Sequence, residues 1–254
     1  MPNPIKSEQV DKLKVRVFED RAAMGAAAGA DAADRLRELL GTRDKARVVF
    51  AAAPSQNETL ATLAKADGID WSRVVALHMD EYLGLRDSAP QRFGKYLKDH
   101  LFDLVKPGRV LLIGGNNEID IECQRYEEFL DEGPIDMVLL GIGENGHIAF
   151  NDPPVADFND LKRIKPVELD EACRRQQVND GCFPSIDNVP THALTLTIPT
   201  LMSGGHLFCS VPGPTKRDAV RRTLTEPVST ECPSTVLRKH PNCTLYVDRA
   251  AYGE

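Results

Sequence analysis

Residues 139–154 form the most informative run of the chain, Leu-Leu-Gly-Ile-Gly-Glu-Asn-Gly-His-Ile-Ala-Phe-Asn-Asp-Pro-Pro. Gly141 and Gly143 follow an apolar stretch, and glycines after a strand let backbone N–H groups approach a ligand closely. His147 and Asp152 come next, and a histidine beside a carboxylate can move protons near neutral pH. The run therefore predicts a site for acid–base catalysis. Taken alone, His147 is more simply read as a structural histidine bonded to a backbone carbonyl.

A second run, His-Met-Asp-Glu-Tyr-Leu-Gly-Leu at residues 78–85, directly follows a predicted strand. Side chains alternate between the two faces of a strand, so Asp80 and Glu81 cannot both face one pocket. We predict that one carboxylate faces the pocket and that the other braces the scaffold. For an isolated pair of acids, two solvated loop residues are the commoner outcome.

Apolar β-rich runs alternate with helical patterns, which predicts an α/β fold with a mostly parallel sheet flanked by helices. No repeat or composition shift marks a linker, so one domain is expected over residues 1–254. Residues 153–192 carry few strand signals and are expected to form a lid or an irregular excursion. The predicted strands are 15–19, 47–53, 73–79, 110–113, 135–140, 193–198, 206–211 and 244–247, and the predicted helices are 20–40, 57–66, 90–105, 120–131 and 215–225.

Three of the loops that follow predicted strands are rich in polar residues, namely 54–58, 80–82 and 141–152. Ligands of parallel sheets bind beyond the carboxyl ends of the strands. These loops are therefore expected to converge on a single active site.

The composition and net charge of the chain argue against some classes of binding partner. The 254 residues carry a net charge of −7 and no long basic run, which argues against duplex nucleic acid and anionic membranes. No apolar stretch approaches the roughly 20 residues of a membrane span, and the N-terminus lacks the apolar core of a secretion signal, so a cytoplasmic protein is expected.

The six cysteines form no C-x-x-C pair and are predicted to be free thiols. No metal site and no cofactor are predicted. The Gly-x-Gly-x-x-Gly spacing is weak evidence for a dinucleotide, because no helix-forming run follows it.

Together, the order and spacing of the two runs resemble the glucosamine-6-phosphate deaminase (isomerase) family. Weaker matches at residues 122–128 and 189–195 extend the resemblance over roughly residues 45–250. It implies a modified Rossmann-like fold and an aldose–ketose isomerisation coupled to loss of ammonia. The sugar ring opens, a proton moves between C2 and C1, and the 2-amino group leaves as a 2-ketose forms.

The resemblance also implies roles for individual residues. Asp80 would shuttle the proton between C1 and C2, His147 would open the ring, and Asp152 would orient the imidazole. Asn145 belongs to the same catalytic group, although many family members have Asp there, and Asp152 stands where Glu is common. The residues expected to bind substrate are Ser55, Glu81, Gly141, Ile142, Gly143 and Lys216, with backbone amides around residues 141–143 cradling the sugar.

The phosphate end of the expected site departs from the family pattern. A Gly-rich loop usually binds the phosphate at a helix N-terminus, and the corresponding loop here is Pro-Ser-Gln-Asn-Glu at residues 54–58. Ser55 and Glu58 match an S-x-x-E capping box. That motif would place the Glu58 carboxylate at the positive helix end, where it would repel a phosphate.

The basic residues of that end are also altered. Lys216 matches the family's phosphate lysine, but Gly181 stands where an arginine is expected, and Arg174 and Arg175 are candidates to compensate. Two interpretations stay open: a phosphate bound by Lys216 and neighbouring arginines, or a preference for a sugar that lacks the usual 6-phosphate. A sugar lactonase of the 6-phosphogluconolactonase type and a catalytically weakened sugar-binding regulator are the alternative functions. The expected partner is a small sugar, and homo-oligomerisation stays open.

Overall fold

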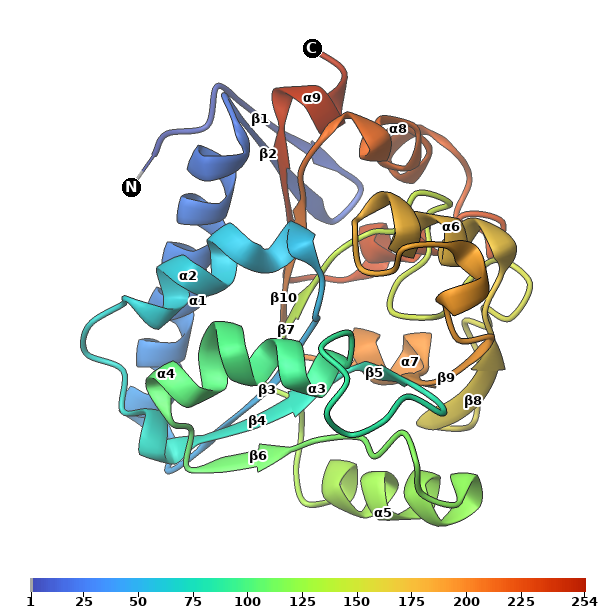
Figure 1. Ribbon diagram of the computed structural model, residues 1–254. Coiled ribbons are helices and arrows are strands. Elements are labelled where there is room, and N and C mark those ends of the chain that lie inside the picture. Colours follow the sequence, from blue (N-terminus) through green and yellow to red (C-terminus); the bar gives the residue numbers. More distant parts are fainter. Residues whose placement is uncertain (1) are drawn as a thin grey trace.

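The computed structural model describes residues 2–254 of the chain. Its centre is an eight-stranded sheet in the order β1-β2-β11-β10-β7-β3-β4-β6 (Figure 1). All neighbours in this sheet are parallel except β1 and β2, which form an antiparallel hairpin. The predicted α/β fold with a mostly parallel sheet is therefore confirmed. The strands are β1 (Lys6–Val10), β2 (Leu13–Phe18), β3 (Ala46–Phe50), β4 (Val74–His78), β6 (Arg109–Leu111), β7 (Met137–Leu140), β10 (His206–Val211) and β11 (Cys243–Asp248).

Helices cover both faces of this sheet, and each face has its own apolar core. Side chains alternate along β3, so that Val48 and Phe50 join one core and Val49 joins the other. The Val48 core contains α1 (Arg21–Thr42), α2 (Asn57–Ala64), α3 (Phe93–Leu97) and α6 (Glu171–Asn179). The Val49 core contains α5 (Ile119–Asp131), α7 (Ile198–Met202), α8 (Arg217–Thr225) and α9 (Arg249–Tyr252). Burial on both faces explains why the central strands are continuous apolar runs.

A second, smaller antiparallel sheet has the order β5-β9-β8. Its strands are β5 (Asp80–Tyr82), β9 (His192–Leu196) and β8 (Ile164–Glu168). The expectation of an irregular excursion over residues 153–192 is thus wrong where β8 and α6 form. Pro166 weakens the strand signal of β8, but β8 is an edge strand that pairs only with β9, where a missing N–H is tolerated.

The predicted helix over residues 90–105 is divided into α3, a π-helical turn over Lys98–Phe102, and α4 (Asp103–Val105). Its apolar residues recur every four positions, a longer period than the 3.6 residues of an α-helical turn. The wider π turn accommodates this period and keeps Phe93, Leu97 and Leu101 buried.

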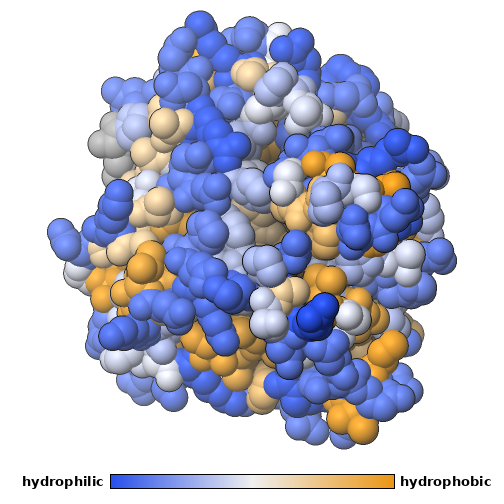
Figure 2. Space-filling model, viewed as in Figure 1, coloured by the Kyte–Doolittle hydropathy of each residue, from blue (hydrophilic) through white to orange (hydrophobic). Residues whose placement is uncertain are grey.

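Among residues 2–254, no helix is both long enough and apolar enough to cross a bilayer. The face shown in Figure 2 is mostly hydrophilic, with scattered apolar patches, and is hollowed near its centre.

Helices α1 and α2 pack closely because α1 carries two glycines at the contact. A Cβ on Gly25 would lie 2.2 Å from Cβ of Glu58, and one on Gly29 would lie 2.6 Å from Cβ of Thr62. The polypeptide that precedes α2 lies at the pocket described below. The glycines of α1 therefore help to fix the position of that loop.

We expect Gly25→Ala to lower the free energy of unfolding by about 1–3 kcal/mol, because overpacking forces α1 and α2 apart. Gly41→Ala is the matched control near the end of the same helix. A Cβ on Gly41 has no atom within 4 Å, so this change should be neutral or stabilise by up to about 1 kcal/mol. Urea unfolding of both variants measures the difference. Equal stabilities of the two variants would contradict the close helix contact.

Candidate active site

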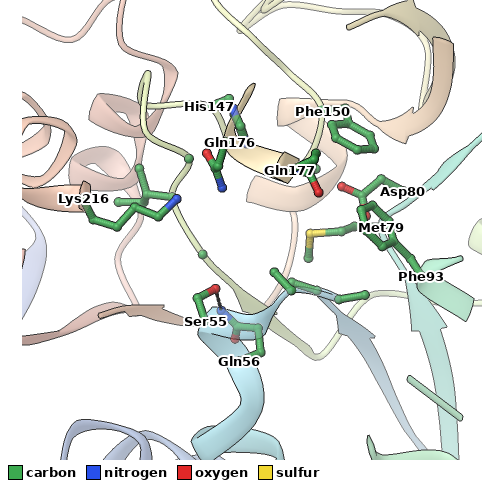
Figure 3. A pocket seen from close by; sticks show the side chains of 17 residues that line it. Ser55, Gln56, Met79, Asp80, Phe93, His147, Phe150, Gln176, Gln177 and Lys216 are labelled. Atoms are coloured by element: carbon green, nitrogen blue, oxygen red, sulfur yellow. Dashed lines mark hydrogen bonds between the residues drawn. The ribbon is translucent and has the colours of Figure 1, made fainter. Parts of the chain in front are cut away.

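A pocket opens at the carboxyl ends of β3, β4, β7 and β10, as expected for a parallel sheet. The segments after these strands bring together seven of the predicted residues, which line the pocket: Ser55, Asp80, Gly141, Ile142, Gly143, His147 and Lys216. Figure 3 shows Lys216 and Asp80 on opposite sides of it, with His147 between them on the upper wall. The three polar loops therefore converge on one site, as the sequence predicted.

His147 is held from behind by two side chains that do not line the pocket. Its Nδ1 lies 2.8 Å from Oδ1 of Asn145 and 2.8 Å from Oδ1 of Asp152. The Asn145 amide also donates to Asp152 at 2.9 Å. Because Nδ1 is occupied in this way, Nε2 is the ring nitrogen left for a ligand.

Asp152 is completely buried, and burial by itself raises the pKa of a carboxyl group. The charge and hydrogen bond of His147 and the hydrogen bond from Asn145 outweigh burial and hold the pKa of Asp152 below its usual value. A carboxylate that stays ionised can orient the imidazole and stabilise its protonated form. The shorter Asp side chain, in place of the Glu common in the family, thus still reaches the histidine.

Gly143 leaves room for the His147 ring. A Cβ at this position would lie 2.2 Å from Cε1 of His147, which no side chain could occupy without displacing the ring. The Gly143 amide donates to the His147 carbonyl at 2.9 Å. This amide is therefore bonded within the loop, and the absence of a side chain at Gly143 is required by the ring.

Asp80 faces the pocket from β5 and is only 7% exposed. Its pKa is raised well above the usual value, first because burial disfavours the charged carboxylate and second because Glu81 adds a negative charge beside it. Such a carboxylate is a stronger base than a solvated one. A raised pKa at the wall of a cavity is typical of residues that transfer protons.

Glu81 points the other way, as strand alternation predicts. It accepts hydrogen bonds from the backbone N–H groups of Phe93 at 3.1 Å and Gly94 at 3.0 Å, and it pairs with Arg92 at 3.4 Å. Glu81 therefore braces the start of α3. The assignment of Glu81 as a substrate-binding residue is wrong, because its side chain lies outside the pocket.

The predicted capping box does not form. Helix α2 begins after a 3₁₀ turn over Pro54–Gln56, its N-cap is Gln56, and no side chain caps it. The Glu58 carboxylate instead lies 2.8 Å from Nε of Arg21 on α1, and Arg21 also donates to the Pro54 carbonyl. Because the Glu58 carboxylate is turned toward α1 and paired with Arg21, the predicted repulsion of a phosphate is not supported. Ser55 remains at the pocket.

Lys216 lines the pocket and is 4% exposed, and burial lowers its pKa. The two compensating arginines do not reach it. Arg174 donates to the carbonyls of Ile186 and Val189, and Arg175 forms an exposed pair with Glu171 on its own helix. Among residues 2–254, Lys216 is thus the cationic side chain that lines this pocket.

Three glutamines complete the walls and were not predicted. Gln56 is fully buried, donates to the Ser210 carbonyl at 3.2 Å, and has an Oε1 atom with no partner among residues 2–254. Gln176 and Gln177 come from α6, and Gln177 accepts a hydrogen bond from the Tyr82 hydroxyl at 2.7 Å. Little in the sequence indicated the two glutamines of α6, because this helix is polar along most of its length.

The fold and this site define an α/β protein that carries an acid–base pair at the carboxyl edge of its sheet. Residues 19–246 match the family of glucosamine-6-phosphate isomerases and 6-phosphogluconolactonases, and the chain belongs to this family.

Similar proteins lie on the deaminase side of that family. The chain is 35% identical over 217 residues to glucosamine-6-phosphate deaminase of Bacillus cereus (strain B4264). The aligned residues cover 85% of this chain and 80% of the relative. It is 36% identical over 196 residues to glucosamine-6-phosphate deaminase 1 of Bacillus subtilis (strain 168). This alignment covers 76% of this chain and 79% of the relative. The predicted family is therefore confirmed.

Solved structures show the same fold. A monomeric glucosamine-6-phosphate deaminase superposes with a TM-score of 0.85 at 32% identity, covering 94% of this chain and 98% of that one. A 6-phosphogluconolactonase from Thermotoga maritima superposes with a TM-score of 0.76 at 20% identity, and the superposition covers 93% of this chain and 100% of that one. The second likeness concerns the fold alone.

Proposed function

We propose that this protein converts glucosamine 6-phosphate into a 2-ketose phosphate with release of ammonia. The observation that carries the proposal is the placement of the Asp80 carboxylate and the His147 imidazole on one pocket, with Lys216 on the opposite side from Asp80. The names of the similar deaminases support the same reaction. A lactonase would need no base over C1 and C2, so the position of Asp80 favours the deaminase.

His147 opens the sugar ring in this proposal. Its Nε2 atom takes the proton from the C1 hydroxyl and returns it to the ring oxygen, and the open-chain aldehyde forms. Asp152 accepts the Nδ1 proton in a hydrogen bond and favours the imidazolium that exists between the two transfers. Asn145 fixes the same nitrogen and the same carboxylate, so it acts as a positioning residue.

Asp80 then removes the proton from C2 and delivers it to C1. One proton moves from the amino nitrogen to O1, so the C2 amine becomes an imine and C1 becomes a hydroxymethyl group. Water adds to the imine, and ammonia leaves as the C2 ketone forms. The raised pKa of Asp80 suits a group that must take up a carbon-bound proton and release it again.

The phosphate lies at the Lys216 end of the pocket, beside the Ser55 hydroxyl. We expect Lys216→Met to raise KM for glucosamine 6-phosphate by roughly tenfold or more, because a charge-assisted contact to the phosphate is lost. Arg175→Met is the matched control, since Arg175 is exposed and paired with Glu171, and its KM should stay unchanged. Steady-state ammonia release from glucosamine 6-phosphate and from unphosphorylated glucosamine measures both effects. Equal use of the two sugars by the unaltered protein would favour the phosphate-free alternative.

The activity should also report the pKa of Asp80. Asp80 must be deprotonated to accept the C2 proton, so kcat/KM is expected to fall on acidification at a pH well above 3.8, the ordinary value for Asp. The effect on folding has the opposite sign, because an acid with a raised folded-state pKa stabilises the fold below its unfolded pKa. That contribution is lost as pH rises through the folded pKa. The pH profile of kcat/KM, measured beside urea midpoints, tests this. An acidic limb at or below pH 3.8 would contradict the role of Asp80.

A further inference from the structure

Behind the His147 ring lies a cluster that proton transfer does not fully explain. A ring nitrogen of His147, a carboxylate oxygen of Asp152 and Sγ of Cys173 all lie within 4.8 Å of one another, and all three residues are buried. Cys173 comes from α6 and has no part in the mechanism above. Imidazole, carboxylate and thiolate together form a ligand set that Zn²⁺ and related ions prefer.

The carboxylate of Asp152 has an unused coordination position. Its Oδ1 atom receives hydrogen bonds, whereas its Oδ2 atom is buried and has no well-formed hydrogen bond among residues 2–254; the nearby Cys173 thiol contributes to holding the pKa of this carboxyl below its usual value. A buried acceptor without a donor costs free energy, which a bound cation would recover. The thiol of Cys173 lies close enough to share that cation.

The spacing of the cluster suits a tetrahedral ion after small adjustments. Zinc holds nitrogen, oxygen and sulfur ligands at about 2.0–2.3 Å, which separates neighbouring ligand atoms by roughly 3.3–3.8 Å. The present distance between Nδ1 of His147 and Oδ1 of Asp152 is 2.8 Å. An opening of about half an ångström would bring this pair to the separation that zinc requires, and the Cys173 sulfur lies within 4.8 Å of the ligand atoms of both residues.

An acidic cavity provides access from the surface. It has a volume of 260 Å³, shares no lining residue with the substrate pocket, and is lined by Asp152 together with Glu168, Asp170 and Glu171. Carboxylates on the walls of a cavity raise the local concentration of cations. This cavity offers a divalent ion a route to Asp152 that is separate from the sugar pocket.

We propose that His147, Asp152 and Cys173 form an inhibitory site for one Zn²⁺ ion. On binding, the thiol of Cys173 releases its proton to solvent, and the single proton of the neutral His147 imidazole moves from Nδ1 to Nε2 as Nδ1 binds the ion. The ring can then no longer accept a proton from the sugar. Metal binding depends only on the cluster, whereas the inhibitory effect rests on the function proposed above.

Binding is tested on the whole chain freed of metal with a chelator. Competition with a chromophoric zinc indicator should give one Zn²⁺ per chain, and Cd²⁺ should produce a thiolate-to-metal charge-transfer absorbance. Cys173→Ser should weaken zinc binding at least about tenfold and abolish that absorbance, because a neutral hydroxyl is a poor zinc ligand. Cys123→Ser is the matched control, since Cys123 is a half-buried thiol on α5, outside the cluster.

Turnover supplies the second measurement. Zinc should lower kcat for glucosamine 6-phosphate with little change in KM, because the ion binds behind the ring rather than in the sugar pocket, and chelator should restore the rate. Cys173→Ser should keep its activity in the presence of the zinc concentration that inhibits the unaltered protein.

Binding of no ion, zinc affinity unchanged by Cys173→Ser, or cadmium absorbance lost in Cys123→Ser would each overturn the site. If Cys173→Ser does not fold, Asp170→Asn is the variant to measure in its place. It removes a negative charge from the access cavity and should slow zinc association several-fold. An unchanged association rate would also count against the site. Zinc binding by a protein that releases no ammonia would refute the proposed function but support the metal site.

Discussion

Asp80→Asn is expected to lower kcat for glucosamine 6-phosphate by about 10²–10⁴-fold while leaving sugar binding nearly unchanged. The asparagine amide keeps the shape of the carboxylate at the pocket wall but cannot accept the C2 proton. Transfer of deuterium from C2 to C1, followed by nuclear magnetic resonance, should disappear with turnover. Substrate-induced thermal stabilisation should persist in the variant.

Asp99→Asn is the matched control, because Asp99 is an exposed acid that pairs with Lys95 on the surface. It should retain both turnover and deuterium transfer. If Asp80→Asn still moved deuterium from C2 to C1 at the original rate, another group would have to be the base.

Gly143→Ala is expected to lower kcat by about 10²-fold or more. Its Cβ would lie 2.2 Å from Cε1 of His147, so the ring must leave its place between the pocket and Asp152. Displacement of a catalytic group by about 1 Å can cost that factor. The loss should fall on kcat, because the groups at the Lys216 end of the pocket are not moved.

Gly141→Ala is the matched control two residues earlier. Its Cβ would lie 3.1 Å from Nε2 of Gln56, so that the amide has to move by only a few tenths of an ångström. We expect a kcat within several-fold of the unaltered protein, measured by the same ammonia assay. Equal losses in both variants would show that the loop as a whole, rather than the imidazole, is sensitive to added bulk.

The sequence predicted the central sheet well because its strands are buried on both faces and are therefore apolar along their length. Residues 206–211 were predicted with their observed bounds, as β10. Elements whose residues are mostly polar were missed, such as β1 with the sequence Lys-Ser-Glu-Gln-Val and α6 with two adjacent arginines. These elements are stabilised by tertiary contacts that a local pattern does not reveal.

Within the site, contiguous motifs were more predictable than contacts between distant segments. His147, Asn145 and Asp152 lie in one run, so their proximity followed from the sequence. Cys173 and the glutamines of α6 reach the site from about thirty residues away. No sequence motif of fixed spacing links Cys173 or these glutamines to the run that contains His147, so their place in the site could not be predicted.

The capping box shows how a local rule can be overridden. Ser55 and Glu58 have the correct spacing, but Gly25 lets α1 approach α2 until Arg21 can pair with Glu58. The tertiary ion pair replaces the local hydrogen bonds. The ion pair also affects the choice of substrate. Since this loop places no carboxylate at the phosphate end of the pocket, a sugar phosphate is favoured over a sugar that lacks the phosphate.

The decisive experiment for the proposed reaction is incubation of the protein with glucosamine 6-phosphate labelled with deuterium at C2. We expect ammonia and a 2-ketose phosphate to form in equal amounts, and C1 of the product to carry deuterium delivered by Asp80. Rapid hydrolysis of 6-phosphogluconolactone, with no ammonia released from the amino sugar, would contradict it.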